Sequence, residues 1–583
     1  FLQDVKSEYE LRKGRKYPYQ KFIMAETPIS FAGYVRNWKG NSEQTQPEMV
    51  FLPEFATTLP SSNFKFAKKR MANWGRRDPQ GAMEEIDVEM NVIRDFARRV
   101  LLSEETFQEE GNTFVNMFSG EWSGTSKLNK YDLSSMYFNY AGSIYSQNFP
   151  IIDIVMNTML KQEESTQGRH FFRMFNGMGD DQRAAAYLNG KSFEQAVLDN
   201  TLSTEVFYEM MKLKGVYLRN YINSRLSSNE FKEFMAEFMK KYQFQEVNFT
   251  RLNSEFIRKF HFNLMDFIPN WYTINSTPRF IVKGVDADQV EVGDYTKYIV
   301  KFQVYNPTNV EGVISVNVEE GGGMFPGGPR GRRGRAAQME AKPAKNYIIE
   351  PRKYKEIRIL CDERPSNLTI NTNISQNLPS TIMQNFAKVT TTTTDTVTGI
   401  FDSNAALFTF NPKEITVDNE DPGFRIIESN QKNKLQSFFK KESEDKYKNL
   451  NFWMPPSKWT ATIGVNYYGD YINSAVYKKS GSGSNKTEWT TQIQIPGFYE
   501  VFVYTSELPM MGWRRRGSEE KKMQYYTVKH DDGEEEISVE TGRGRQGWMT
   551  LGSFYFSAGE AKITLSDKGS ESNQIIFADA VKW

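Results

Sequence analysis

Near its C-terminal end the chain contains the sequence Pro496-Gly497-Phe498-Tyr499-Glu500-Val501-Phe502-Val503-Tyr504, from which the fold of this part can be inferred. Its side chains alternate between two sets: Tyr499, Val501 and Val503, then Glu500, Phe502 and Tyr504. Successive side chains of a strand point to opposite faces, so this period of two predicts a strand with one face in a sandwich core. Downstream, Asp531-Asp532-Gly533 forms a turn that tolerates positive φ and joins two further strands.

Other blocks surround this strand in a fixed order. They are Gly469-Asp470-Tyr471, Thr490-Thr491-Gln492-Ile493, Tyr526 to Gly533, Gly547 to Phe556, and Ala578-Asp579-Ala580-Val581-Lys582-Trp583. Together the blocks resemble the golvesin C-terminal domain, also called the xanthan-lyase carbohydrate-binding-like domain. The resemblance implies a β-sandwich accessory module of secreted or surface proteins at residues 424–583. We expect Trp548 and Trp583 to pack in its core.

Upstream, the apolar period changes twice and divides the rest of the chain. Residues 1–82 carry short extended runs such as Met49 to Glu54, and residues 83–275 carry apolar residues at helical spacing. A second series of short strands, which begins after Ser276-Thr277-Pro278, predicts a β-sandwich at 276–416. The fold class is therefore multidomain α+β, with a helical region followed by two β-sandwich domains. The expected helices include 180–199, 204–225, 228–242 and 249–261.

The helical region also resembles a known family. Lys212 to Ile222 and the aromatic residues that end in Trp271, with Glu26-Thr27-Pro28 upstream, resemble M1-family aminopeptidases over residues 18–275. That resemblance implies a gluzincin-like fold whose zinc helix carries His-Glu-x-x-His. Between Glu54 and Ile144, where the family places this helix, the chain has no such motif, and Met83 to Leu101 contains no histidine. We carry over the fold and expect no peptidase activity.

The three histidines give no metal site at ligand spacing. His170, His261 and His530 lie far apart in the sequence, and we expect them on helix surfaces, in satisfied cores or at a strand end. The lone Cys361 excludes an internal disulfide and a cysteine-based zinc cluster. No nucleophile elbow, phosphate loop or dinucleotide fingerprint occurs. We therefore expect no catalytic residues, no metal and no cofactor, while paired carboxylates leave a glycosidase-like or lyase-like site open.

One loop is a candidate contact site. Trp513 follows Gly512 beside Arg514, Arg515 and Arg516, in a loop where burial of a tryptophan is not the default. The indole and guanidinium groups suit a sugar ring or a groove on a protein partner. A solvated loop tip is the alternative.

Charge and hydropathy limit the partners. The 73 basic and 72 acidic residues nearly cancel, so the chain has no overall field that would favour nucleic acid. No run reaches the roughly 20 apolar residues of a transmembrane helix. The sequence starts at Phe1, which leaves open an upstream signal peptide or membrane-anchored region. The oligomeric state stays open.

Three functions fit these observations. The first is a non-catalytic scaffold or subunit, with a degenerate peptidase-like fold, in a surface or outer-membrane protein assembly. The second is a polysaccharide-binding or polysaccharide-processing surface protein. The third is an active metallopeptidase with an atypical or unseen zinc site. Envelope proteins or a glycan are the expected partners, and the expected location is the periplasm or cell surface of a Gram-negative, Bacteroidota-type bacterium.

Overall fold

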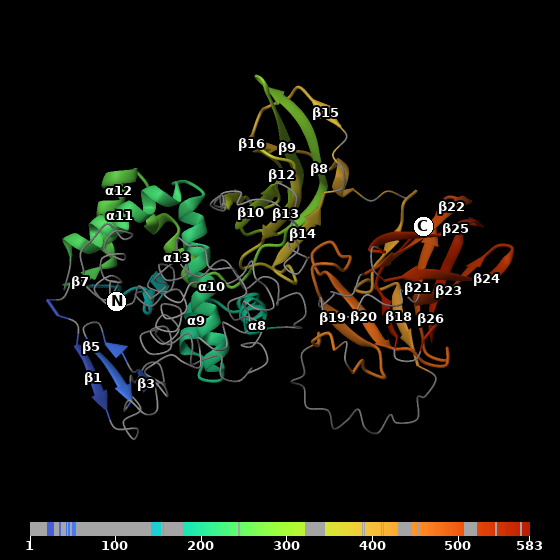
Figure 1. The fold of residues 1–583 in the computed structure, drawn as a ribbon, viewed down its shortest axis with the longest axis horizontal. Coiled ribbons are helices and arrows are strands. Elements are labelled where there is room, and N and C mark those ends of the chain that lie inside the picture. Colours follow the sequence, from blue (N-terminus) through green and yellow to red (C-terminus); the bar gives the residue numbers. More distant parts are fainter. Residues whose placement is uncertain are drawn as a thin grey trace, which may run out of the picture. The chain divides into compact units, whose positions relative to one another are not determined.

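A computed structural model describes 20–21, 23–27, 34–35, 42–43, 45–46, 49–53, 142–152, 155–156, 179–242, 245–320, 344–386, 389, 391–409, 411, 413–428, 446–451, 454–506, 522–542, 545–571 and 574–583. The chain divides into two compact units (Figure 1). One unit contains Phe1–Arg169 and Leu226–Phe267, and the other contains His170–Arg225 and Ile268–Trp583. Among the described residues, no helix is both long and apolar enough for a membrane span.

The described part of the first unit combines short strands with helices. Its strands are β1 (Ile23–Thr27), β2 (Tyr34–Val35), β3 (Ser42–Glu43), β4 (Thr45–Gln46), β5 (Met49–Pro53), β6 (Gly142–Tyr145) and β7 (Gln245–Asn248). Parallel pairs form between β1 and β5 and between β6 and β7. The helices are α11 (Ser228–Lys241) and α12 (Phe249–Phe260), followed by the short η4 (Leu264–Asp266). Both helices were expected, whereas Met83 to Leu101 lies outside the described residues.

The described helices of the second unit are α8 (Asp180–Leu188), α9 (Phe193–Leu198), α10 (Thr204–Asn223) and α13 (Ile268–Thr273). Serine side chains cap the N-termini of α9 and α10. The single helix expected at 180–199 is wrong. Gly190, at φ 148°, follows the end of α8, and Ser192 begins α9 with a capping box to Gln195.

Helix α10 contains a buried lysine. Lys214 donates to the carbonyl oxygen of Trp271 at 2.5 Å, and the Trp271 indole donates back to the Lys214 carbonyl at 3.3 Å. Burial of this ammonium group lowers the pKa of Lys214 to about 7. The two reciprocal bonds fix α13 against α10.

The first β-sandwich packs two sheets around one core. The strands are β8 (Ile281–Val292), β9 (Tyr295–Tyr305), β10 (Gly312–Glu320), β11 (Lys345–Ile349), β12 (Tyr354–Cys361), β13 (Pro365–Asn371), β14 (Thr381–Asn385), β15 (Thr392–Thr393) and β16 (Gly399–Asp402), with η5 (Ala406–Phe408) after them. One sheet has the order β15-β8-β9-β12-β16 and the other β11-β10-β13-β14. Phe302 from the first sheet and Ile370 from the second lie in the same buried cluster. The predicted sandwich is therefore present.

The C-terminal part is also built of packed sheets. Its strands are β17 (Thr416–Val417), β18 (Phe424–Ile427), β19 (Thr460–Ile463), β20 (Ser474–Lys479), β21 (Lys486–Ile493), β22 (Gly497–Thr505), β23 (Lys522–His530), β24 (Gly533–Thr541), β25 (Gly547–Phe556), β26 (Gly559–Gly569), β27 (Ile575–Ala578) and β28 (Val581–Lys582). They form sheets in the orders β17-β28-β22-β25, β18-β21-β26-β23-β24 and β19-β20-β27. The first two sheets share a core that contains Trp489, Val501 and Trp583. In Figure 1 the C-terminal end lies beside β22 and β25.

A candidate binding face on the C-terminal sheet

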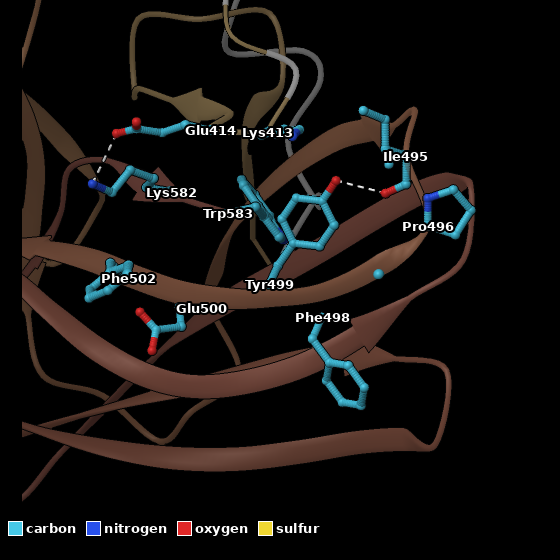
Figure 2. A pocket seen from close by; sticks show the side chains of 11 residues that line it. Lys413, Glu414, Ile495, Pro496, Phe498, Tyr499, Glu500, Phe502, Lys582 and Trp583 are labelled. Carbon is cyan, nitrogen blue, oxygen red and sulfur yellow. Dashed lines mark hydrogen bonds and ion pairs between the residues drawn. The ribbon is translucent and has the colours of Figure 1, made fainter.

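Strand β22 presents an aromatic row on the side that faces away from the core. Tyr499, Val501 and Val503 are buried, as the alternation of the sequence predicts. The residues that alternate with them are exposed or half-buried and point to the opposite side: Phe498, Glu500, Phe502 and Tyr504. Figure 2 shows Phe498 and Tyr499 on opposite sides of the strand. An outward face with three aromatic rings in four positions is unusual, because such faces are commonly polar.

Strand β25 completes this face by means of a β-bulge. Tyr555 pairs with Phe498 and Ser553 with Glu500, but the register then shifts, and Thr550 pairs with Phe502. The bulge adds one residue to β25 near Gly552, whose φ of 139° is rarely adopted by L-residues. Because of this extra residue, Trp548 and Thr550 before the bulge point to the same outward side as Ser553 and Tyr555 after it. We call the outward side of β22 and β25 the binding face.

The most exposed part of the binding face is an aromatic pair. Phe498 is 77% exposed and Tyr555 is 37% exposed, and their rings meet edge to face with centroids 5.3 Å apart. Next to them Ile495 is 44% exposed. Its carbonyl oxygen accepts a hydrogen bond of 2.7 Å from the Tyr499 hydroxyl, which holds the turn before β22. Exposed apolar rings on a rigid strand are typical of a contact surface.

A second aromatic group lies at the other end of the binding face. Tyr504 pairs with Trp548 in the β22–β25 register, and their ring centroids are 5.3 Å apart. Tyr468 completes the group at 5.6 Å from Tyr504 and 5.1 Å from Trp548. Burial raises the pKa of Tyr504 to about 12, so its hydroxyl stays protonated at neutral pH.

Charged side chains lie between and beside these aromatic groups. The ammonium group of Lys582 lies over the rings of Phe502 and Trp548, at 5.2 and 5.0 Å from their centroids, and binds Glu414 at 3.2 Å. Glu500 and Lys413 make no ion pair with any described residue. A shallow groove of about 470 Å³ lies beside the first half of β22 (Figure 2), and it is lined by Lys413, Glu414, Ile495, Pro496, Gly497, Phe498, Tyr499, Glu500, Phe502, Lys582 and Trp583.

This arrangement suits binding better than chemistry. The described residues contain no group of three or more histidine, cysteine or carboxylate side chains placed to hold a metal ion. The binding face offers flat apolar rings for stacking and Glu500 for hydrogen bonds, and Lys413 lines the neighbouring groove. Pockets for small ligands and sugars combine these two kinds of group.

The structure describes some of the residues that the sequence analysis singled out and not others. Trp513, Arg514, Arg515 and Arg516 lie outside the described residues, as does His170. His530 ends β23, as expected, and its ring lies 5.0 Å from that of Phe554. His261 caps the C-terminus of α12 in the left-handed conformation at φ 53°.

The sequence prediction missed the binding face. Trp583 is 3% exposed and packs in the core, as predicted. The expected burial of Trp548 is wrong, since Trp548 is half-buried and points outward beside Tyr504. Strict alternation along β25 would place Trp548 on the face opposite to Tyr555, and the bulge at Gly552 reverses this. The outward set of β22 was already visible in the sequence, but its aromatic character was not used.

Comparison with protein families identifies the C-terminal part. Residues 448–583 match the family model of the golvesin C-terminal domain, which confirms that part of the predicted resemblance. Phe498, Tyr555, Tyr504 and Trp548 all lie inside the matched stretch. This match does not extend to the helical region, whose likeness to M1 aminopeptidases stays a prediction. No protein of curated function matches the chain.

Solved structures give only distant similarities. A xanthan lyase from Paenibacillus shares 13% identity over 52% of this chain and 26% of its own chain, with a TM-score of 0.20. An exo-β-1,3-galactanase from Phanerochaete chrysosporium shares 8% identity over 52% and 68%, with a TM-score of 0.19. A cycloisomaltooligosaccharide glucanotransferase from Paenibacillus shares 8% over 52% and 72%, with a TM-score of 0.15. TM-scores this low carry no argument about fold or activity.

Proposed function

We propose that this chain is a polysaccharide-binding protein and that its binding face holds the glycan. The single observation that carries this proposal is the exposed Phe498–Tyr555 pair on the outer side of a rigid sheet. Sugar rings have one face of C–H groups, which packs against an aromatic ring, while their hydroxyl groups need polar partners. Glu500, the next outward residue of β22 after Phe498, supplies such a partner. The golvesin match supports an accessory module in this position.

A glycan microarray tests the proposal on the intact chain. The array carries neutral and uronate-containing oligosaccharides, each as a ladder of chain lengths from one unit to six. The proposal expects concentration-dependent binding to at least one ladder. The absence of binding to every ladder at high protein concentration would overturn it. In that case the exposed aromatic pair becomes a contact for a protein partner, as the scaffold hypothesis requires.

We further propose that residues 18–275 keep a peptidase-like fold without a zinc site. The proposal rests on Lys212 to Ile222, which lies within α10, and on the Trp271 bonds to Lys214. Zinc analysis and an aminopeptidase assay of the purified chain test it. Stoichiometric zinc with peptide turnover would overturn it and restore the metallopeptidase hypothesis.

Localisation and the basic loop are also proposals. The resemblance to surface accessory modules supports an extracytoplasmic position in a Gram-negative cell envelope, which cell fractionation and protease shaving of intact cells test. Trp513 with Arg514 to Arg516 is a proposed additional contact, supported by the sequence alone. Replacement of Trp513 by alanine should weaken binding to the ligand found on the array if the loop takes part.

A further inference from the structure

We propose that the binding face takes an internal stretch of a long, neutral polysaccharide, which lies along β22 from Phe498 to Tyr504. This inference rests on the proposed function and specifies its ligand. It assigns a second contact site to Tyr504 and Trp548, at the far end of the face from Phe498 and Tyr555. The ligand therefore touches two separate aromatic groups on one strand pair.

The two aromatic groups are in line because they belong to the same register. Phe498 pairs with Tyr555, and six residues further along β22 Tyr504 pairs with Trp548. At about 3.3 Å per residue, this places the groups roughly 20 Å apart. A single sugar ring cannot contact both groups, whereas a polymer that runs parallel to β22 can.

The surface between the two groups is exposed except at Phe502, over which the ammonium group of Lys582 lies. Glu500 and Ser553 are exposed as a cross-strand pair, Thr550 is exposed in the next pair, and its partner Phe502 is half-buried. No described side chain of these pairs closes the path along the strand. A site for chain ends needs a wall at one end. Here both aromatic groups can be reached by one extended chain, so internal segments fit.

The charges in the groove beside the face favour a neutral polymer. Four charged side chains line the groove: Lys413, Lys582, Glu414 and Glu500. Their formal charges cancel, and Lys582 is already paired with Glu414 and covered by its two aromatic neighbours. A polyanion would bring carboxylates next to Glu500 and Glu414, at a cost in electrostatic repulsion.

The test uses chain length as its readout, on the same oligosaccharide ladders and with the intact chain. For the ligand with the strongest signal, the dissociation constants of the disaccharide and the hexasaccharide are compared by isothermal titration calorimetry. In the wild type we expect the hexasaccharide to bind at least about tenfold more tightly, because it gains the second aromatic group. Trp548→Ala should bring this ratio close to one, because the hexasaccharide loses its second aromatic group.

A second variant tests the same inference in case Trp548→Ala does not fold. Thr550→Arg keeps both aromatic groups but places a long charged side chain on the open path, and it should also remove the length dependence. A matched control is Tyr295→Ala, which removes a 73% exposed ring from β9 in the other sandwich. It should change neither constant.

Each outcome decides between the two proposals. Equal affinity for short and long oligomers, or a preference for the uronate ladders, overturns the inference but leaves glycan binding intact. A loss of affinity that is equal for both lengths in Thr550→Arg also overturns it. A chain that binds no ladder at all overturns the proposed function instead.

Discussion

Gly552→Ala should weaken the β22–β25 pair, because the bulge depends on a backbone conformation that suits glycine. Gly552 has φ 139°, a region in which a residue with a Cβ atom costs on the order of 1–3 kcal/mol. An added Cβ would also lie 3.0 and 3.2 Å from two ring carbons of Phe554. We therefore expect a loss of about 1–3 kcal/mol from backbone strain, with a further loss from the ring contact.

Gly559→Ala provides the matched control, since it separates strain from crowding. Gly559 also has φ 139°, but no atom lies within 4 Å of its added Cβ. This variant should lose the strain energy alone, and the loss should be local to the connection between β25 and β26 and to the start of β26. The difference between the two variants then measures the contact with Phe554.

Hydrogen–deuterium exchange of the intact chain gives the assay. Local opening of β22 and β25 sets the exchange rate of their amides, and about 1.4 kcal/mol corresponds to a tenfold change in rate. In Gly552→Ala, peptides that cover Gly497–Thr505 and Gly547–Phe556 should exchange roughly 5 to 150 times faster. If exchange in these peptides stays at the wild-type rate while Gly559→Ala accelerates exchange at the start of β26, the role given to Gly552 in the bulge is refuted.

Three further substitutions probe buried charges, each by thermal or chemical unfolding. Lys478→Met should destabilise the C-terminal sheets by about 3–5 kcal/mol, because it leaves the carboxylate of Asp567 buried without its cation. The double variant Lys478→Met with Asp567→Leu should lose less free energy of unfolding. Burial raises the pKa of Asp418 to about 8, so the free energy of unfolding of the wild type should fall as pH rises from about 4 to 8. Asp418→Asn should make this fall smaller. An equal dependence on pH in both proteins would count against a buried, protonated Asp418. Burial lowers the pKa of Lys214 to about 7. Between pH 7 and 10 the unfolded chain keeps a proton that the folded chain has lost, so the free energy of unfolding should rise over this range. Lys214→Met should abolish that rise.

Much of the C-terminal fold could be predicted because its signals are local. The alternation of Tyr499, Val501 and Val503 identified the buried face of β22, and Asp531-Asp532-Gly533 identified the hairpin between β23 and β24. The prediction of a single helix at 180–199 failed although the sequence signal that divides it is also local. Gly190 and the Ser192 capping box divide the helix that was expected as one.

The candidate site was harder to predict because it depends on two strands at once. The direction of Trp548 follows from the register shift between β22 and β25, which no single strand determines. Gly552 inside a strand was the only local sign of a bulge. The default expectation that an aromatic residue packs in the core is correct for Trp583 and wrong for Trp548. The prediction instead favoured Trp513, whose surroundings could be inferred only from composition.

The central claim is that the outward aromatic residues of β22 and β25 bind a glycan. The most direct test measures the affinity of the intact wild-type chain, Phe498→Ala and Tyr295→Ala for the strongest hexasaccharide of the array. Phe498 is 77% exposed and Tyr295 is 73% exposed, so both substitutions remove a solvent-facing ring at little expected cost to folding. The account predicts that Phe498→Ala weakens binding at least about tenfold, or by about 1.4 kcal/mol, and that Tyr295→Ala has no effect. Binding that is unchanged in Phe498→Ala, or weakened equally in both variants, would contradict it.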